Sequence, residues 1–512
     1  MKKFFVVLLA LLANQFLFSQ LENIPKKKTQ KAFAKIDFLS IDLPINPLGF
    51  KDPNMGYTGI HYNLMIQDWA YAGLGIYGAV SGNKGGFFTL GVNAGIKKYY
   101  HSFYIDSGFH FGGGGGAGAP DGGGAFILPH FNVGYDFKSF SINSGWSYVN
   151  FFDKGNIKGH QLNIGLEIPL DYKYASYNSL ETTSELERLK NSDWNGNSTR
   201  NSLLFHVNNL KIKGDSKDTN GEKYTGETIR LAGFELASYI DKNWFAFFKV
   251  DGAFDGIDAG YMDVFLGGGY HFSMNKNRSN ILLKFGIGAG GGGGVDTKGG
   301  FLIYPDISFE QKLFNDLYLS INKGFVMSPD SYFYTSSLGV GVKYYIERNG
   351  IIAPNRTFTK GKFKGLEVLV KQDLYFDAER ITNPTENLHQ ISLQINLLLN
   401  KHLYVAGQTS FANFGNAGAY AEGIVGLGIK TSPFLDKTTT VFTQLLGGAA
   451  GGGNISTGEG LIIKPSIGLD YKLNETLSLR SAFGYVSSKG GTLSSTYVNF
   501  GIKYKLSFLK MN

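Results

Sequence analysis

The chain contains three copies of one unit, and this repetition limits its fold more than any other feature. Each copy has a glycine run, a short loop, further glycine, an apolar triplet and then a proline. The prolines are Pro129, Pro305 and Pro465, so the copies are offset by 176 and 160 residues. The match extends over about 140 residues per copy, which is longer than a solenoid repeat of ~20–50 residues and predicts a complete sheet unit.

Within each copy, apolar and polar residues alternate with a period of two, which indicates β-strands. Around Pro305, Ile303 lies on one face, whereas Asp306 and Glu310 lie on the other. In the last predicted strand, Phe500 and Lys503 are separated in the same way. A soluble sandwich would give the same alternation, because its apolar face packs on a second sheet.

Two further features favour a barrel that crosses a membrane. The polar face of the strands is rich in glycine, asparagine and charge, as expected of a barrel interior. Aromatic residues gather at predicted strand ends, for example Tyr99–Tyr100, Tyr344–Tyr345 and Tyr504, where interface girdles lie. With 70 glycines, 29 tyrosines and 42 phenylalanines, the composition favours strands over helices.

The first nineteen residues have the form of a cleavable secretory signal peptide. Lys2 and Lys3 precede an apolar run from Phe4 to Ala13, and Ser19 ends a short polar stretch. The chain has no cysteine, so we expect neither a lipid anchor on cysteine nor disulfides. No later apolar run approaches the ~18–20 residues of a membrane-spanning helix.

The rest of the chain divides into three β repeats and connecting segments. Residues 20–30 are predicted to be a solvated N-terminal tail, and the repeats occupy 31–175, 200–346 and 362–512. The segment 176–199 is a periplasmic linker, in which Ser184 and Glu187 resemble a capping box and predict a short helix near 183–190. The segment 347–361 is a second linker without periodicity.

Each repeat holds about eight strands, which gives about 24 in all. In repeat two the strands are predicted to begin near Leu203, Glu227, Trp244, Tyr261, Asn280, Gly300, Leu317 and Ser331. Short turns alternate with longer connections, which is the rule for membrane barrels with periplasmic turns and external loops. If the N-terminus lies in the periplasm, the three glycine runs lie outside the cell and Asn191 lies on the periplasmic side.

Two arrangements of these strands fit the sequence. Duplication of strands within one closed barrel of about 24 strands is the simpler evolutionary origin, and we therefore expect a single barrel. Three tandem eight-stranded barrels are the alternative, which the abundant inward glycine favours because small residues suit narrow barrels. Pairing of residues near 162–172 with 203–212 would indicate one barrel, whereas pairing with 35–45 would indicate three.

As a whole, the mature chain resembles Gram-negative outer-membrane β-barrel proteins. The signal peptide, the strand alternation and a final aromatic-bearing strand ending in Leu506-Ser507-Phe508 carry this resemblance. It extends to a class and to no particular transporter, enzyme or assembly factor. It implies an all-β antiparallel transmembrane barrel in the cell outer membrane, with membrane lipids as partners.

No pattern in the sequence indicates catalysis or a cofactor. The glycine runs lack the lysine and hydroxyl residue of a phosphate loop, and there is no G-x-S-x-G elbow. None of the nine histidines recurs at an aligned position in all three repeats. We therefore predict no enzyme activity and no metal site. The glycine runs are interpreted as places where strands bend or another backbone approaches, with external ligand binding as the alternative.

The candidate functional residues are instead polar side chains on the inner face. Aligned inner positions carry charges of both signs, which either line water or form internal salt bridges. These residues suit a passive pore or transport channel for small hydrophilic solutes, and the alternative is a scaffold subunit of an outer-membrane assembly or secretion complex with envelope protein partners. The scattered charges and the export signal exclude a nucleic-acid partner. The candidate lumen-facing residues are Glu167, Lys343, Lys503, Glu310, Asp470 and His130.

Overall fold

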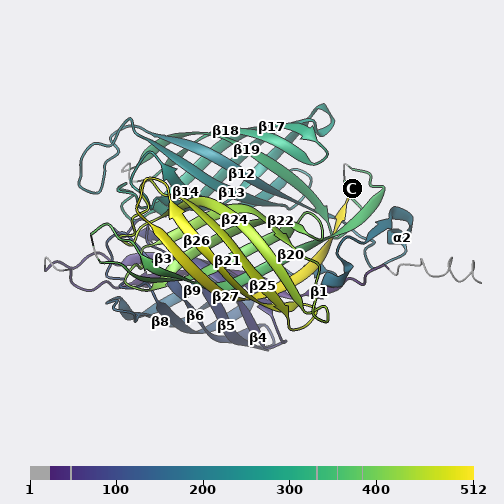
Figure 1. Ribbon diagram of the computed structural model, residues 1–512, viewed down its shortest axis with the longest axis horizontal. Coiled ribbons are helices and arrows are strands. Elements are labelled where there is room, and N and C mark those ends of the chain that lie inside the picture. Colours follow the sequence, from purple (N-terminus) through teal and green to yellow (C-terminus); the bar gives the residue numbers. More distant parts are fainter. Residues whose placement is uncertain (1–23, 47–48, 330–332, 355, 383) are drawn as a thin grey trace, which may run out of the picture.

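The computed structural model describes residues 24–46, 49–329, 333–354, 356–382 and 384–512 of the chain. The predicted signal peptide and the first residues of the tail lie outside this part. The regular secondary structure of the described residues is almost entirely antiparallel β-sheet, which confirms the predicted all-β barrel class. Figure 1 shows long strands running side by side through the molecule.

The first eight-stranded ring closes on itself. Its first and last strands pair antiparallel, with Ile36 opposite Leu166. We call this ring barrel 1. It consists of β2 (Ala32–Ile41), β3 (Met55–Met65), β4 (Ala70–Ser81), β5 (Phe88–Tyr100), β6 (Phe103–Gly115), β7 (Phe126–Asp136), β8 (Ser141–Phe151) and β9 (Lys158–Pro169).

A second ring, barrel 2, closes by pairing of its first and last strands, with Phe205 opposite Val342. Its strands begin within about three or four residues of the predicted starts. They are β12 (Thr199–Ile212), β13 (Thr228–Tyr239), β14 (Trp244–Asp255), β15 (Met262–Met274), β16 (Ser279–Gly291), β17 (Phe301–Phe314), β18 (Leu317–Met327) and β19 (Tyr334–Arg348), with the short 3-10 turn η2 (Asn275–Asn277) after β15.

The third ring, barrel 3, closes between its first and last strands, with Val370 opposite Ile502. A single further pair, Arg348 with Lys510, joins barrels 2 and 3. The strands of barrel 3 are β20 (Lys360–Ala378), β21 (Glu386–Leu398), β22 (Leu403–Phe414), β23 (Ala421–Lys430), β24 (Thr439–Gly451), β25 (Leu461–Lys472), β26 (Leu477–Ser488) and β27 (Ser494–Met511).

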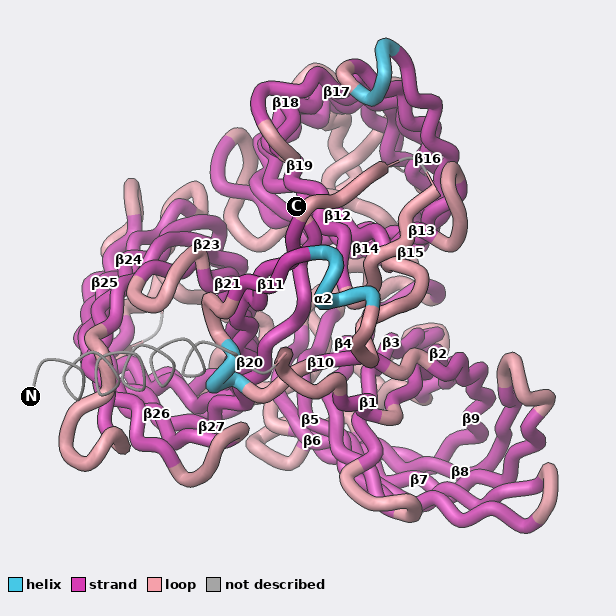
Figure 2. The backbone as a smooth tube through the Cα atoms, turned by 90° about the vertical axis from the view of Figure 1, so that its right-hand side faces the viewer, coloured by secondary structure: helices cyan, strands magenta, loops and turns pink. Residues whose placement is uncertain are grey.

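The expectation of one barrel of about 24 strands is therefore wrong, and the alternative of three tandem barrels is correct. Residues 163–169 pair with 33–39, which is the pairing that distinguishes the two arrangements. Figure 2 shows the three rings at the corners of a triangle. Each repeat can close alone because eight strands enclose a space that side chains fill, and closure leaves no unpaired edge.

The connecting segments are more ordered than expected. The strand β1 (Lys28–Gln30) pairs with β10 (Tyr172–Tyr174), so these tail residues belong to a sheet. The linker forms η1 (Tyr177–Ser179), β11 (Thr183–Glu185), which pairs with β20, and the helix α2 (Leu186–Lys190). The predicted capping box does not form, because Ser184 lies in β11 and the N-cap Glu185 makes no side-chain cap bond.

A small apolar core holds this linker against the end of barrel 3. It buries residues of the linkers together with the start of β20 and the end of β27. Trp194 is fully buried, and its indole nitrogen donates a hydrogen bond to the carbonyl of Pro25 at 2.7 Å. The linkers are therefore packed onto one end of barrel 3. The core residues are Ala175, Leu189, Trp194, Phe358, Phe363, Leu509 and Met511.

The surface chemistry of the barrels is inverted relative to a water-soluble protein. The side chains of Val340 and Phe500 are 50% and 63% exposed on the outer face, as predicted. Asp306, Glu310 and Lys503 are buried on the inner face. Among the described residues, no helix has the length and hydrophobicity required to span a membrane. An apolar exterior around polar interiors is the pattern of strands that face lipid.

At the opposite end from the linkers, the glycine runs join the barrels. The loop before the fourth strand of each barrel (82–87, 256–261 and 415–420) meets the loop after the fifth strand of a neighbour (292–300, 452–460 and 116–125). We call these contacts junctions 1–2, 2–3 and 3–1. Together they form a ring in which each barrel uses the same two loops.

The glycines at the junctions are required by backbone proximity. In junction 1–2, the Gly85 amide donates to the carbonyl of Lys298 at 2.7 Å, and in junction 3–1 the Gly418 amide donates to that of Gly122 at 3.1 Å. In junction 2–3, a Cβ on Gly451 would lie 2.6 Å from the Gly260 nitrogen. The interpretation of the glycine runs as sites of close backbone approach is therefore confirmed.

Candidate functional site in the charged barrel interiors

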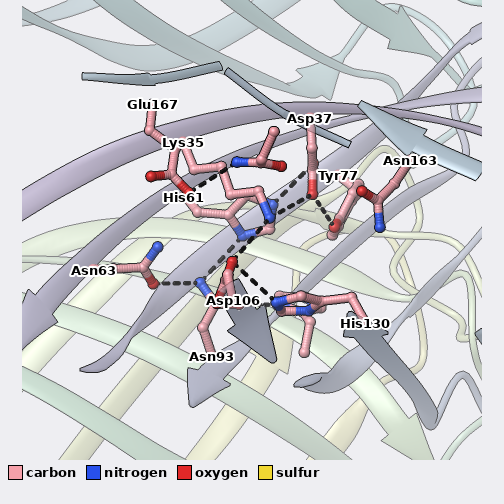
Figure 3. A network of polar contacts seen from close by, with 12 residues as sticks. Lys35, Asp37, His61, Asn63, Tyr77, Asn93, Asp106, His130, Asn163 and Glu167 are labelled. Carbon is pink, nitrogen blue, oxygen red and sulfur yellow. Dashed lines mark hydrogen bonds and ion pairs between the residues drawn. The ribbon is translucent and has the colours of Figure 1, made fainter. Parts of the chain in front are cut away.

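Barrel 1 is filled by a network of polar side chains, shown in Figure 3. The Lys35 ammonium on β2 lies 3.8 Å from the Asp106 carboxylate on β6. These strands are four positions apart in a ring of eight, so the pair crosses the interior. Asp106 also accepts a hydrogen bond from the Tyr71 hydroxyl at 2.8 Å, and its other oxygen lies 3.3 Å from His130 Nε2.

A second pair crosses barrel 1 at the same level, because Glu167 is the register partner of Lys35 and Lys97 that of Asp106. Lys97 on β5 pairs with Glu167 on β9, again from opposite sides of the ring. Glu167 also accepts a hydrogen bond from Asn143 at 3.0 Å. Both ion pairs are buried, and each charged group has a partner, as buried charges require. Two neighbouring ion pairs therefore connect opposite walls of this barrel.

Barrel 2 has the same kind of interior with different residues. The Lys284 ammonium lies 2.8 Å from Glu235 and 3.0 Å from Asp306. The Lys343 ammonium lies 2.9 Å from Glu310 and 3.7 Å from Glu235, so Glu235 links the two lysines. All five side chains are buried. The network joins strands β13, β16, β17 and β19 across the ring.

In barrel 3, Lys464 on β25 is the central cation. Its ammonium lies 2.8 Å from Asp373 on β20 and 3.0 Å from Glu422 on β23. Arg480 binds Asp470 through two parallel hydrogen bonds of 2.7 and 2.9 Å, which is the strong bidentate geometry of guanidinium and carboxylate. These contacts close the middle of the third interior.

The structure places all six predicted lumen-facing residues inside the barrels. Lys343 pairs with Glu310, and its aligned counterpart Lys503 pairs with Asp470 at 2.5 Å. Glu167, at the same aligned position in barrel 1, instead pairs with Lys97, and His130 lies beside Asp106. Of the two roles that the sequence left open, the charges form internal salt bridges.

Other interior residues were not singled out from the sequence. Lys35, Lys284 and Lys464 each contact two carboxylates, yet none lies in a recurring motif. The only signal that could have found them is their inward register in the period-two pattern. The pairing itself depends on the small diameter of the ring, which brings opposite walls within reach of one lysine side chain.

The inner glycines have less room than expected. A wet interior would tolerate serine at Gly341 or Gly501. In the structure, a Cβ at either position would lie 2.4 Å from a carbonyl oxygen, that of Phe205 or of Val370. We therefore expect serine at these positions to shift the neighbouring strand.

A cavity of about 460 Å³ opens at the linker end of barrel 3, and we call it the vestibule. Its floor includes the lumen residues Glu367, Asp470 and Lys503. Six of the lining side chains are lysines and three are carboxylates, so its charge is positive. The lysines are Lys401, Lys430, Lys437, Lys472, Lys503 and Lys505.

Lys505 differs from the other buried lysines of this barrel. Its side chain is only 8% exposed, but among the described residues no carboxylate or hydrogen-bond acceptor is in contact with its ammonium. The nearest interaction is with the Tyr177 ring, whose centroid lies 5.5 Å away. By contrast, Lys430 lies 2.6 Å from Glu367. The vestibule therefore contains a buried cation that is available to an anion.

Outside the spanning strands, one carboxyl group has an unusual environment. Asp121 lies in the loop between β6 and β7, at junction 3–1, and is 9% exposed. Burial raises the pKa of this carboxyl to about 7, although the Gly116 amide donates a hydrogen bond to it. Among the described residues, no group of three or more histidine or acidic side chains could hold a metal ion.

Comparison with known proteins gives no family. No protein-family model and no curated protein matches the chain. Among solved structures, Pseudomonas aeruginosa OpdQ and Acinetobacter baumannii OccAB3 align at 8% identity over 94% of this chain and over 98% and 100% of their own chains, respectively. The outer membrane protein opdK from Pseudomonas aeruginosa aligns at 10% identity over 94% of this chain and 98% of its own. All three TM-scores are 0.22, too low to carry an argument about fold or function.

Proposed function

We propose that this chain is an outer-membrane β-barrel protein that provides a narrow path for small hydrophilic anions through barrel 3. The outer-membrane placement is supported by the signal-like N-terminus, the aromatic strand ends and the apolar outer faces of the barrels. The chain acts on solutes by passage, and no turnover chemistry is assigned to it.

The observation that carries the channel is the vestibule. It opens on the polar interior of barrel 3, and Lys505 offers an uncompensated positive charge close to that opening. Rings of charged side chains set the selectivity of pores, and lysine favours anions. A wide passive pore does not fit an eight-stranded barrel, because ion pairs such as Lys464 with Asp373 cross the interior. Passage would require these pairs to exchange partners with the permeating ion.

Purified protein in planar bilayers tests this proposal. We expect small, stepwise conductance that favours anions over cations in a salt gradient. Lys505→Glu should reduce the anion preference, since it reverses the free charge of the vestibule. Lys98→Glu is the matched control, because Lys98 is exposed near the linker end of barrel 1. An equal effect of the two variants would contradict a path through barrel 3.

A second candidate function is structural. The cross-lumen ion pairs and hydrogen bonds in all three barrels favour it, because they brace the walls and close the interiors. In this case the chain would be a scaffold for envelope proteins. An electrically silent bilayer, together with envelope proteins that co-purify at fixed stoichiometry, would overturn the channel and support the scaffold.

A further inference from the structure

A second cavity lies between barrels 2 and 3. Its volume is about 500 Å³, which is within the ~300–1,000 Å³ of ligand pockets. Its walls are formed by β12–β14, β18 and β19 of barrel 2 and by β22–β24 of barrel 3, and Phe88 of barrel 1 closes it near the centre. Figure 1 shows β14 and β24 adjacent where the two barrels meet. We call this cavity the inter-barrel slot.

The slot has no charged side chain directed into it. The polar residues in its walls face the interiors: His206 binds Asp251 at 2.6 Å, and Glu422 binds Lys464 at 3.0 Å. Gln408 and Tyr261 likewise bind the interior carboxylates Asp373 and Asp263. The remaining lining consists of alanine, glycine, valine, leucine, isoleucine, phenylalanine and methionine, together with Thr409. A hydrated or charged ligand would therefore lose its water without gaining partners.

Glycines on barrel 3 keep the slot open. A Cβ on Gly423 would meet no atom within 4 Å, and one on Gly407 would meet only a methyl group of Val425, at 4.0 Å. Neither residue has a positive φ. Neither the backbone conformation nor a close contact within the chain therefore requires glycine at these two positions. The junction glycines differ, because another backbone lies against them.

The other two barrels fill the equivalent positions. The strand registers align Gly423 with Leu90 of barrel 1 and Val264 of barrel 2, since all three residues lie opposite a small residue of the fifth strand. Leu90 and Val264 are buried in an apolar cluster between the barrels. The same comparison aligns Gly407 with Leu74 and Phe248, and Gly447 with Phe111 and Ile287.

We propose that the inter-barrel slot binds one acyl chain of a bilayer phospholipid. The slot continues into the lipid-facing surface, where Val425 and Leu445 are 41% and 56% exposed, so a chain can enter from the side. Its apolar walls match a hydrocarbon chain, which fills the slot with dispersion contacts that its lining would otherwise lack. The inference rests on the proposed membrane placement but not on conductance.

A direct test measures retained lipid. The protein is reconstituted with palmitoyl-oleoyl-phosphatidylethanolamine, exchanged into detergent and separated from free lipid, and the bound lipid is quantified by mass spectrometry. The test variant is Gly407→Phe/Gly423→Val/Gly447→Ile, which introduces the barrel 2 residues. We expect about one lipid per chain in the original protein and at least a fivefold loss in the variant.

The control variant is Ser481→Ile, which adds apolar volume to the outer face of β26, away from the slot. It should retain lipid like the original protein. Equal retention by the triple variant, or no retained lipid in any protein, would overturn the proposal. Gly423→Val alone replaces the triple variant if the latter fails to fold, and it should lower retention in the same direction. A protein that retains lipid but conducts no ions would reject only the channel.

Discussion

The three junctions between barrels are built alike, whereas the three interiors are filled differently. Each junction uses the loop before a fourth strand and the loop after a fifth strand. Where the strands cross, small residues face each other in two junctions, Gly78 with Ala289 and Gly252 with Ala449. At the equivalent position of junction 3–1, Phe411 on the third strand of barrel 3 replaces the small residue. Gly113 on the fifth strand of barrel 1 then takes the place of the alanine.

The interiors of the barrels, in contrast, are filled by different types of polar residue. Barrel 1 uses three histidines, namely His61, His110 and His130, among its buried polar groups. Barrel 3 instead uses glutamines together with more lysine, and its Gln394 and Gln444 bind each other at 3.0 Å. This difference indicates that an interior tolerates any side chains that satisfy one another, whereas a junction limits the combined size of the residues that face each other, because two backbones are in contact.

The largest effect is expected from an unpaired charge inside a barrel. Lys464→Met leaves Asp373 and Glu422 buried without their shared cation, which costs ~3–5 kcal/mol for a broken buried pair. Denaturant unfolding in lipid vesicles measures the loss. Lys505→Met is the matched control, because this buried lysine has no carboxylate partner. A similar loss from both variants would show that pairing is not what stabilises the interior.

The outer face should be nearly as sensitive to charge. Phe500→Arg places a guanidinium on the lipid-facing side of β27, where arginine costs ~2–4 kcal/mol near the midplane. Phe500→Leu should be close to neutral. The same unfolding assay compares the two variants. If arginine were tolerated in vesicles, the outer face would be wet and the membrane placement would be contradicted.

Overpacking at a junction should have a smaller effect. A Cβ on Gly113 would lie 2.3 Å from the Ala412 carbonyl oxygen, so Gly113→Val should cost ~1–3 kcal/mol and loosen junction 3–1. The control is Gly159→Val, because a Cβ there would meet no atom within 4 Å. Protease sensitivity of the loops 116–125 and 415–420 should rise only in the Gly113 variant. Unchanged sensitivity would mean that the barrels do not depend on this contact.

The smallest effect is a dependence of junction 3–1 on pH. The pKa of Asp121 is raised to about 7 from 3.8, so between these values the folded state binds a proton that the unfolded state has lost. Stability should therefore fall as pH rises through this window and stay level above it. Asp121→Asn should reduce that slope in the melting temperature. An unaltered slope would assign the pH dependence to other groups.

The topology of the chain remains a prediction from the sequence. We expect the glycine-run end to face outwards and the linker end, with Asn191, to face the periplasm. A tag between Asn220 and Gly221 is a suitable probe, because this loop is exposed and lies outside the junctions. It should be reached by antibody on intact cells, whereas a tag at Asn191 should not. The reverse labelling would invert the topology.

The sequence alone determined the strands and their two faces. A period of two in residues such as Ile303, Asp306 and Phe500 is a local property of the extended chain, because successive side chains point to opposite sides. The same pattern placed Glu310, Lys343, Asp470 and Lys503 on the inner face. Repetition of the unit fixed the number of strands in each repeat.

The number of barrels that these strands form, and the pairing of the charges inside them, depend on long-range contacts that the local pattern does not specify. The local pattern of a last strand such as β9 is compatible with pairing to the first strand of its own repeat or to that of the next repeat. Backbone hydrogen bonds do not depend on side-chain identity, so they do not distinguish the two partners. The choice of the near partner makes each ring narrow. That small diameter brings Lys35 to Asp106 and Lys464 to Asp373, and it leaves the outer faces free to meet at glycine.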